Sequence, residues 1–132
     1  MSALTRQRSR EPGPVSDLIL HITTRRTWEE ALDAGAFEPA SLTEDGFIHF
    51  SSPHQLIAVA NAGFSGTNDL VLLCADSSRL VAPLDYEGVA PGGERFPHLY
   101  GPLNLEAVVA VVPFARGRHG FAIPDGLEQL LG

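Results

Sequence analysis

Lysine is absent from the 132-residue chain, so all nine of its Lys+Arg residues are arginines. A Walker-type phosphate loop, Schiff-base chemistry and a Ser–Lys dyad each need a lysine, and the sequence therefore excludes all three. The single cysteine, Cys74, excludes an intramolecular disulfide framework and multi-cysteine zinc or iron–sulfur sites. The longest apolar runs, 70–75 and 107–114, are far shorter than the roughly 20 residues of a membrane helix.

Positive charge is scarce outside the N-terminal segment. The formal net charge is −7, but residues 1–16 carry +2, which leaves −9 on the remainder. Such an acidic chain lacks the basic surface that drives DNA or RNA binding, whereas a small anion beside an arginine is still compatible with it. Residues 1–16 have no apolar stretch typical of a secretory signal and are predicted to be a disordered tail, with 17–132 as a single domain. We expect a cytoplasmic protein that binds neither DNA nor membranes.

The pattern of apolar and turn-forming residues predicts short strands and helices in irregular alternation. A capping-box pattern begins at Thr27, and Trp28, Ala31 and Leu32 are expected to face the core of the helix that follows. A long stretch rich in Gly and Pro, 88–104, is predicted to be an irregular functional loop. The mixture favours an α+β fold, with strands predicted at 18–22, 47–51, 69–75, 79–86, 107–114 and 120–124 and helices at 27–35, 52–63 and 125–131.

Three histidines lie in settings that short apolar strands do not explain. His21 and His49 interrupt apolar runs, and His98 lies in the predicted loop. Each alone is compatible with a structural histidine that is hydrogen-bonded to nearby backbone. Together they indicate proton transfer, ligand recognition or metal binding, and we expect them to line one pocket. The spacings of 28 and 49 residues match no zinc signature, so no metal site is predicted.

Other candidate site residues lie close to these histidines in the sequence. Ser51 and Ser52 stand where a predicted strand enters a helix N-terminus, a position suited to an anion; Ser52 is expected to cap the helix. Arg95 and Tyr100 belong to the predicted loop, and Glu87 at its start is the carboxylate expected nearest the histidines. A serine or cysteine hydrolase is not favoured, because no Gly-x-Ser-x-Gly motif is present.

Several motifs resemble one bacterial and plant family. They are Leu-His-Ile at 20–22, Gly-Phe-Ile-His-Phe-Ser at 46–51, Gln55, and above all Phe-Pro-His-Leu-Tyr-Gly-Pro-Leu at 96–103. Over residues 18–114 the sequence resembles the family known as domain of unknown function 952. That family is similar in fold to the ADP-ribosyltransferase superfamily, so the resemblance implies a split β-sheet with flanking short helices that holds NAD in a cleft.

The resemblance also implies roles for individual residues. His21 corresponds to a first-strand histidine that contacts the nicotinamide ribose, and His49 and Ser51 correspond to a motif that shapes the nicotinamide pocket. The Q/E-x-E motif of many active transferases is absent, and either Glu87 or His98 corresponds to that region.

Three functional hypotheses follow. The first is a transferase or glycohydrolase that takes NAD or an ADP-ribose-type nucleotide as its substrate, without a resident cofactor. Its catalytic residues are His21, His49, His98 and Glu87, where a carboxylate would stabilise an oxocarbenium-like transition state. The second is a non-catalytic module that binds a nucleotide or small anion, and the third is a metal-dependent hydrolase. In the first two, the ligand contacts Ser51, Ser52, Arg95 and Tyr100. The oligomeric state is left open.

Overall fold

Three antiparallel strands form the central sheet of the computed structural model, which describes residues 17–88 and 93–131. Strand β4 (Leu70–Asp76) lies between β1 (Leu18–Thr24) and β8 (Val108–Phe114). Nearly every residue of β1 and β4 is buried, which means that this sheet is covered on both faces. Strands buried on both faces are continuous apolar runs rather than alternating ones. The predicted strands at 18–22, 69–75 and 107–114 are therefore confirmed.

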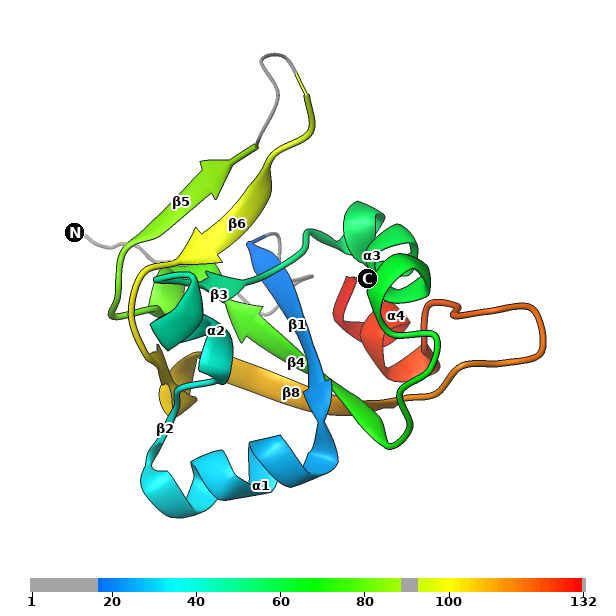
Figure 1. Ribbon diagram of the computed structural model, residues 1–132, viewed down its shortest axis with the longest axis horizontal. Coiled ribbons are helices and arrows are strands. Elements are labelled where there is room, and N and C mark those ends of the chain that lie inside the picture. The colour runs from blue at the N-terminus through cyan, green and yellow to red at the C-terminus, as the bar shows by residue number, and fades with distance from the viewer. Residues whose placement is uncertain (1–16, 89–92, 132) are drawn as a thin grey trace.

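Different elements cover the two faces of this sheet. Helices α3 (Leu56–Gly63) and α4 (Asp125–Leu131) pack on one face, where Leu56 and Leu127 join a core cluster with Leu20 and Leu72. Figure 1 shows these two helices side by side. The opposite face carries helix α1 (Arg25–Ala34) and the remaining strands, whose core includes Phe37. In the part of the chain that the structure describes, no helix combines the length and apolarity needed to cross a bilayer.

A second three-stranded sheet lies beside the first. Its central strand is β6 (Phe96–Leu99), between β3 (Ile48–His49) and β5 (Leu84–Glu87). The sheets meet where Leu20 and Ser51 exchange two backbone hydrogen bonds of 2.8 and 2.7 Å. The smaller elements are strands β2 (Ala36–Phe37) and β7 (Leu103–Asn104), helix α2 (Ala40–Glu44), and the 3₁₀ turns Pro53–Gln55, Ser77–Arg79 and Leu105–Ala107.

The structure confirms the α+β class and the three predicted helices, with two corrections in α1. Its N-cap is Thr24, not Thr27: the Thr27 backbone N–H donates to Thr24 Oγ1 at 3.2 Å. Ala31 is buried as expected, but Leu32 is 53% exposed, so its assignment to the core is wrong. Successive residues of a helix point about 100° apart, so the face that buries Ala31 leaves Leu32 at its edge. The predicted tail, 1–16, lies outside the described residues.

The prediction of an irregular loop over 88–104 is wrong in its second half, because β6 and β7 lie there. Pro97 obscured β6, since proline lacks the N–H that a central strand normally donates. Pro97 nevertheless joins the sheet through its carbonyl, which accepts a hydrogen bond from the Phe50 N–H at 2.9 Å. The predicted strand at 79–86 begins only at Leu84.

Two other predicted strands differ from the structure. The predicted strand at 47–51 is reduced to β3 plus the Ser51 bridge to Leu20. The predicted strand at 120–124 is wrong, because within that range only Gly120 forms a bridge, with Gly117.

Candidate functional site

A cleft of about 490 Å³ lies where the two sheets and helix α3 come together. Its volume is within the range of small-molecule sites, roughly 300 to 1,000 Å³. The walls are mainly aliphatic and aromatic side chains: Leu20, Ile22, Phe50, Val59, Phe64 and Phe96. The polar lining consists of His21, His49, His98, Ser41 and Ser51. The three histidines that the sequence singled out thus border the same cleft, although they come from three different strands.

His21 lies in β1 between two aromatic rings. Its ring centroid is 5.2 Å from that of Phe37 and 5.6 Å from that of Phe50. Nδ1 is 2.6 Å from the His49 backbone carbonyl, and because a carbonyl only accepts, the proton must be on Nδ1. Burial lowers the pKa of His21 to about 4, against the opposing effect of this hydrogen bond. The ring is therefore neutral at pH 7, and its Nε2 carries a lone pair.

His49 and His98 face each other across the β3–β6 ladder, where they are register partners. Their ring centroids are 5.6 Å apart in an edge-to-face arrangement. His49 Nε2 donates to Asp45 Oδ2 at 2.9 Å, and His98 Nδ1 donates to Glu87 Oε1 at 2.9 Å. Because each carboxylate accepts one ring N–H, the two imidazoles are held in opposite tautomers. The nitrogens left over are Nδ1 of His49 and Nε2 of His98.

Glu87 lies behind His98 and does not line the cleft. It accepts a second hydrogen bond from the hydroxyl of Tyr100. The hydrogen bonds from Tyr100 and His98 lower the pKa of Glu87, and the Glu87 carboxylate in turn raises the pKa of Tyr100 to about 12. Phe47 stacks on the His98 ring with a centroid distance of 4.0 Å. His98 is thus fixed by an ionised carboxylate at its edge and by an aromatic ring on its face.

The other predicted ligand residues lie at different depths. Ser51 is buried and lines the cleft. Ser52 does not line it and caps the following turn, where its backbone N–H donates to Gln55 Oε1 at 2.8 Å. The Gln55 side chain also donates to the Arg95 backbone carbonyl at 2.7 Å, while Arg95 itself is exposed. Arg95 and Tyr100 are not among the lining residues.

Sequence reasoning missed three residues of this region. Ser41 lines the cleft, and its buried Oγ has no hydrogen-bond partner among the described residues. Asp45 precedes His49 by four residues, and Phe47 precedes it by two. The period of two in a strand places Phe47 and His49 on one face, a signal that could have identified Phe47. No comparable signal pointed to Ser41.

The cleft offers three imidazole rings as possible metal ligands, but one nitrogen of each ring is already engaged in a hydrogen bond. Each of the three histidines donates one ring N–H to a protein oxygen. Among residues 17–88 and 93–131, no group of three or more His, Cys, Asp or Glu side chains is arranged to hold a metal ion.

Comparisons with known proteins place the fold in a specific group. A family model described as "Protein of unknown function (DUF952)" matches residues 22–111. The crystal structure of protein CC0527 from Caulobacter crescentus is 36% identical, with a TM-score of 0.75 over 84% of this chain and 98% of that one. The solution NMR structure of CC0527 is 37% identical, with a TM-score of 0.68 over 80% of this chain and 90% of that one. The comparison with curated proteins gave no match.

Proposed function

The chain belongs to the DUF952 family, and we propose that it binds NAD or a related ADP-ribose-type nucleotide in the histidine-lined cleft and transfers or hydrolyses the ADP-ribosyl group. The observation that carries the proposal is the meeting of His21, His49 and His98, from three strands, at one largely apolar cleft. The proposal includes an ADP-ribosyltransferase-like split sheet. The two three-stranded sheets, joined through Leu20 and Ser51, are compatible with that arrangement.

The chemistry of the lining suits a nucleoside portion of the ligand. Aromatic walls such as Phe50 and Phe96 accommodate a flat heterocycle, and the Nε2 lone pair of His21 accepts a hydrogen bond from a ribose hydroxyl. Among the residues that the structure describes, no arginine lines the cleft. The phosphates are therefore expected outside it, towards exposed Arg95, the neighbour of the lining residue Phe96.

Departure of nicotinamide from NAD leaves positive charge on the ribose ring. Preorganised negative charge stabilises such a transition state. Glu87 is the ionised carboxylate that holds His98, at 2.9 Å, and its effect reaches the cleft through that ring. In this proposal, His98 is the group that contacts the reacting ribose, and Glu87 positions and polarises it.

Binding and turnover can be measured separately. Calorimetry with NAD, ADP-ribose and a 2′-phosphorylated nucleotide tests binding, and release of nicotinamide tests turnover. His21→Asn is the informative variant, because an asparagine amide can replace Nδ1–H towards the His49 carbonyl but offers nothing in place of Nε2. We expect wild type to bind one of the three nucleotides below millimolar concentration and the variant to bind at least tenfold more weakly.

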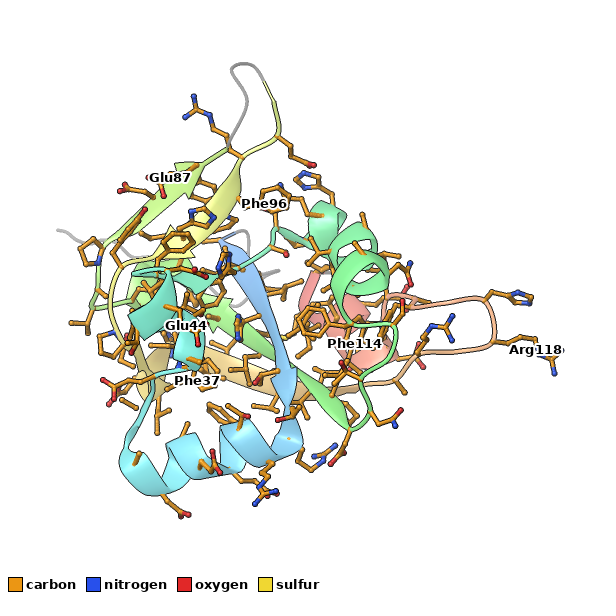
Figure 2. All side chains as sticks on the ribbon, in the orientation of Figure 1. Phe37, Glu44, Glu87, Phe96, Phe114 and Arg118 are labelled. Carbon is orange, nitrogen blue, oxygen red and sulfur yellow. The ribbon has the colours of Figure 1, made fainter. Side chains whose placement is uncertain are left out.

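A matched control is available at another histidine. His119 is exposed in the turn between Gly117 and Gly120, next to Arg118, which Figure 2 labels at the far end of the 115–120 segment. His119→Ala should bind like wild type. Absence of binding to all three nucleotides at millimolar concentration would overturn the proposal.

A non-catalytic binding module is the second candidate. The position of Glu87 favours this candidate, because its carboxylate is already hydrogen-bonded to His98 and Tyr100 and does not line the cleft. Nucleotide binding without release of nicotinamide would support this candidate over the transferase.

A further inference from the structure

We propose that His49 and His98 form a general acid and general base pair that hydrolyses small 2′,3′-cyclic ribonucleotides in the same cleft without a metal ion. This activity goes beyond the proposed use of NAD, since it breaks a phosphorus–oxygen bond and not a glycosidic one. It is carried by the juxtaposition of two imidazoles, each held by its own carboxylate, on facing positions of neighbouring strands.

The geometry provides what such a pair needs. A general acid and a general base must reach the same reacting centre, one of them protonated and the other not. The rings of His49 and His98 are 5.6 Å apart and border one cleft. One ring can therefore act as the base while the other acts as the acid at the same reacting centre.

The opposite tautomers make the two free nitrogens available. Asp45 occupies Nε2 of His49 and Glu87 occupies Nδ1 of His98, so Nδ1 of His49 and Nε2 of His98 have no partner among the described residues. His21 contributes no positive charge here, because its low pKa keeps it neutral. The charged groups next to the pair are the carboxylates of Asp45 and Glu87, together with Asp85, which is the register partner of His98 in β5. All three are acidic, so they compensate the positive charge of an imidazolium that forms during the reaction.

Two observations point to water as the nucleophile. Ser51 lines the cleft, but within the described residues no hydrogen bond joins a serine to a histidine, so no serine is activated by a neighbouring base. The Cys74 thiol is fully buried in the core of β4 and cannot reach a substrate.

The cleft and the charge of the chain define the substrate class. A phosphoryl centre develops negative charge on its oxygens during attack, and an imidazolium compensates that charge. A volume of about 490 Å³ with aromatic walls suits one nucleoside unit. The net charge of −7 disfavours polymeric RNA, which leaves a mononucleotide with an internal diester.

The proposed step balances without any co-reactant other than water. The water oxygen attacks phosphorus while one imidazole takes the water proton. The bond between phosphorus and O2′ breaks as the other imidazole gives its proton to O2′. The product is a 3′-phosphomonoester with a free 2′-hydroxyl. Both imidazoles have then exchanged protonation states, and proton exchange with solvent restores them.

The test uses the full chain, 2′,3′-cyclic mononucleotides of the four bases and an excess of EDTA, with product identified by chromatography. We expect the 3′-monophosphate to form and the pH profile of kcat/KM to be bell-shaped. His49→Gln and His98→Asn each keep an amide that can reach the carboxylate partner but lack a titratable nitrogen. Each should lower kcat/KM at least 100-fold, within the range of general acid–base catalysis. His119→Ala should equal wild type.

Three results would overturn the inference. The first is that no cyclic nucleotide is hydrolysed at millimolar concentration. The second is hydrolysis that EDTA abolishes and a divalent metal restores. The third is an unchanged kcat/KM in both His49→Gln and His98→Asn. Calorimetry with NAD separates this inference from the proposed function. If nicotinamide is released from NAD while cyclic nucleotides stay intact, the phosphodiesterase activity alone is refuted. If cyclic nucleotides are hydrolysed but NAD, ADP-ribose and the 2′-phosphorylated nucleotide do not bind, the NAD proposal alone is refuted.

Discussion

Acidification should destabilise the protein through one half-buried side chain, His21. Its pKa is about 4 in the folded protein, against an ordinary value of 6.5, mainly because burial penalises the charged ring. Between these values, the unfolded chain binds a proton that the folded protein does not. The stabilisation is therefore complete above pH 6.5 and is lost as the pH falls towards 4.

The two pKa values set the magnitude. One pKa unit corresponds to about 1.4 kcal/mol, so the separation between 6.5 and about 4 amounts to about 3 kcal/mol in full. About 2 kcal/mol of this is lost by pH 5. That is a large part of the roughly 5 to 15 kcal/mol by which domains are typically stable. Glu87 affects stability in a different pH range. Its lowered pKa stabilises the folded protein, and this stabilisation is lost only as the pH falls below the ordinary pKa of 4.5.

Urea unfolding at pH 7.5 and pH 5 measures the effect. The His21→Asn variant has no titratable ring at this position, so its free energy of unfolding should fall by about 2 kcal/mol less than that of wild type between the two pH values. Comparing the change within each protein removes any difference in their stability at pH 7.5. An equal loss in both proteins would refute the assignment of a depressed pKa to His21.

Three further predictions concern the core and one turn. Burial raises the pKa of Cys74 to about 12, so a thiol reagent should leave it unmodified in the folded protein and react fully in urea. Leu99→Ala, at a fully buried site, should lower the free energy of urea unfolding by about 2–5 kcal/mol, whereas Leu32→Ala, half exposed, should change it by less than about 0.5 kcal/mol. Gly101→Ala should cost about 1–3 kcal/mol in the same assay, because the added Cβ would lie 2.7 Å from that of Ala82; no loss would show that this segment relaxes freely.

The central sheet was predictable because its strands leave a local signal. The apolar runs that begin at Leu18 and Leu70 are buried on both faces, and such runs need no knowledge of their neighbours to be identified. The strand containing Pro97 gave the opposite signal. Its place in a sheet depends on a partner that does not need the missing N–H, and that partner, Phe50, is 47 residues away. The rule that proline is disfavoured in a central strand is correct, but the contact with a distant segment of the chain allows Pro97 to lie in this sheet.

The candidate site was predictable only in part for the same reason. His21 and His49 were identifiable because a polar ring in an apolar strand needs a partner, and His98 because it belongs to the motif at 96–103; all three border the cleft. The partners themselves were harder to identify. Asp45 lies in a turn before β3, where an aspartate is common, although its carboxylate fixes the tautomer of His49. Arg95 was chosen for its charge, but its hydrogen bond to Gln55 uses the backbone carbonyl.

The register of the second sheet links the core to the chemistry. Ile48 pairs with Leu99 and His49 pairs with His98, so the apolar pair and the imidazole pair are successive rungs of one short ladder. Both apolar side chains are fully buried. Because strand side chains alternate between faces, a slip of one residue would turn Leu99 out of the core and move His98 away from the face it shares with His49. The free energy of burying two ordinary hydrophobic residues therefore holds the two histidines opposite one another, and β3 can be two residues long without leaving their relative position undetermined.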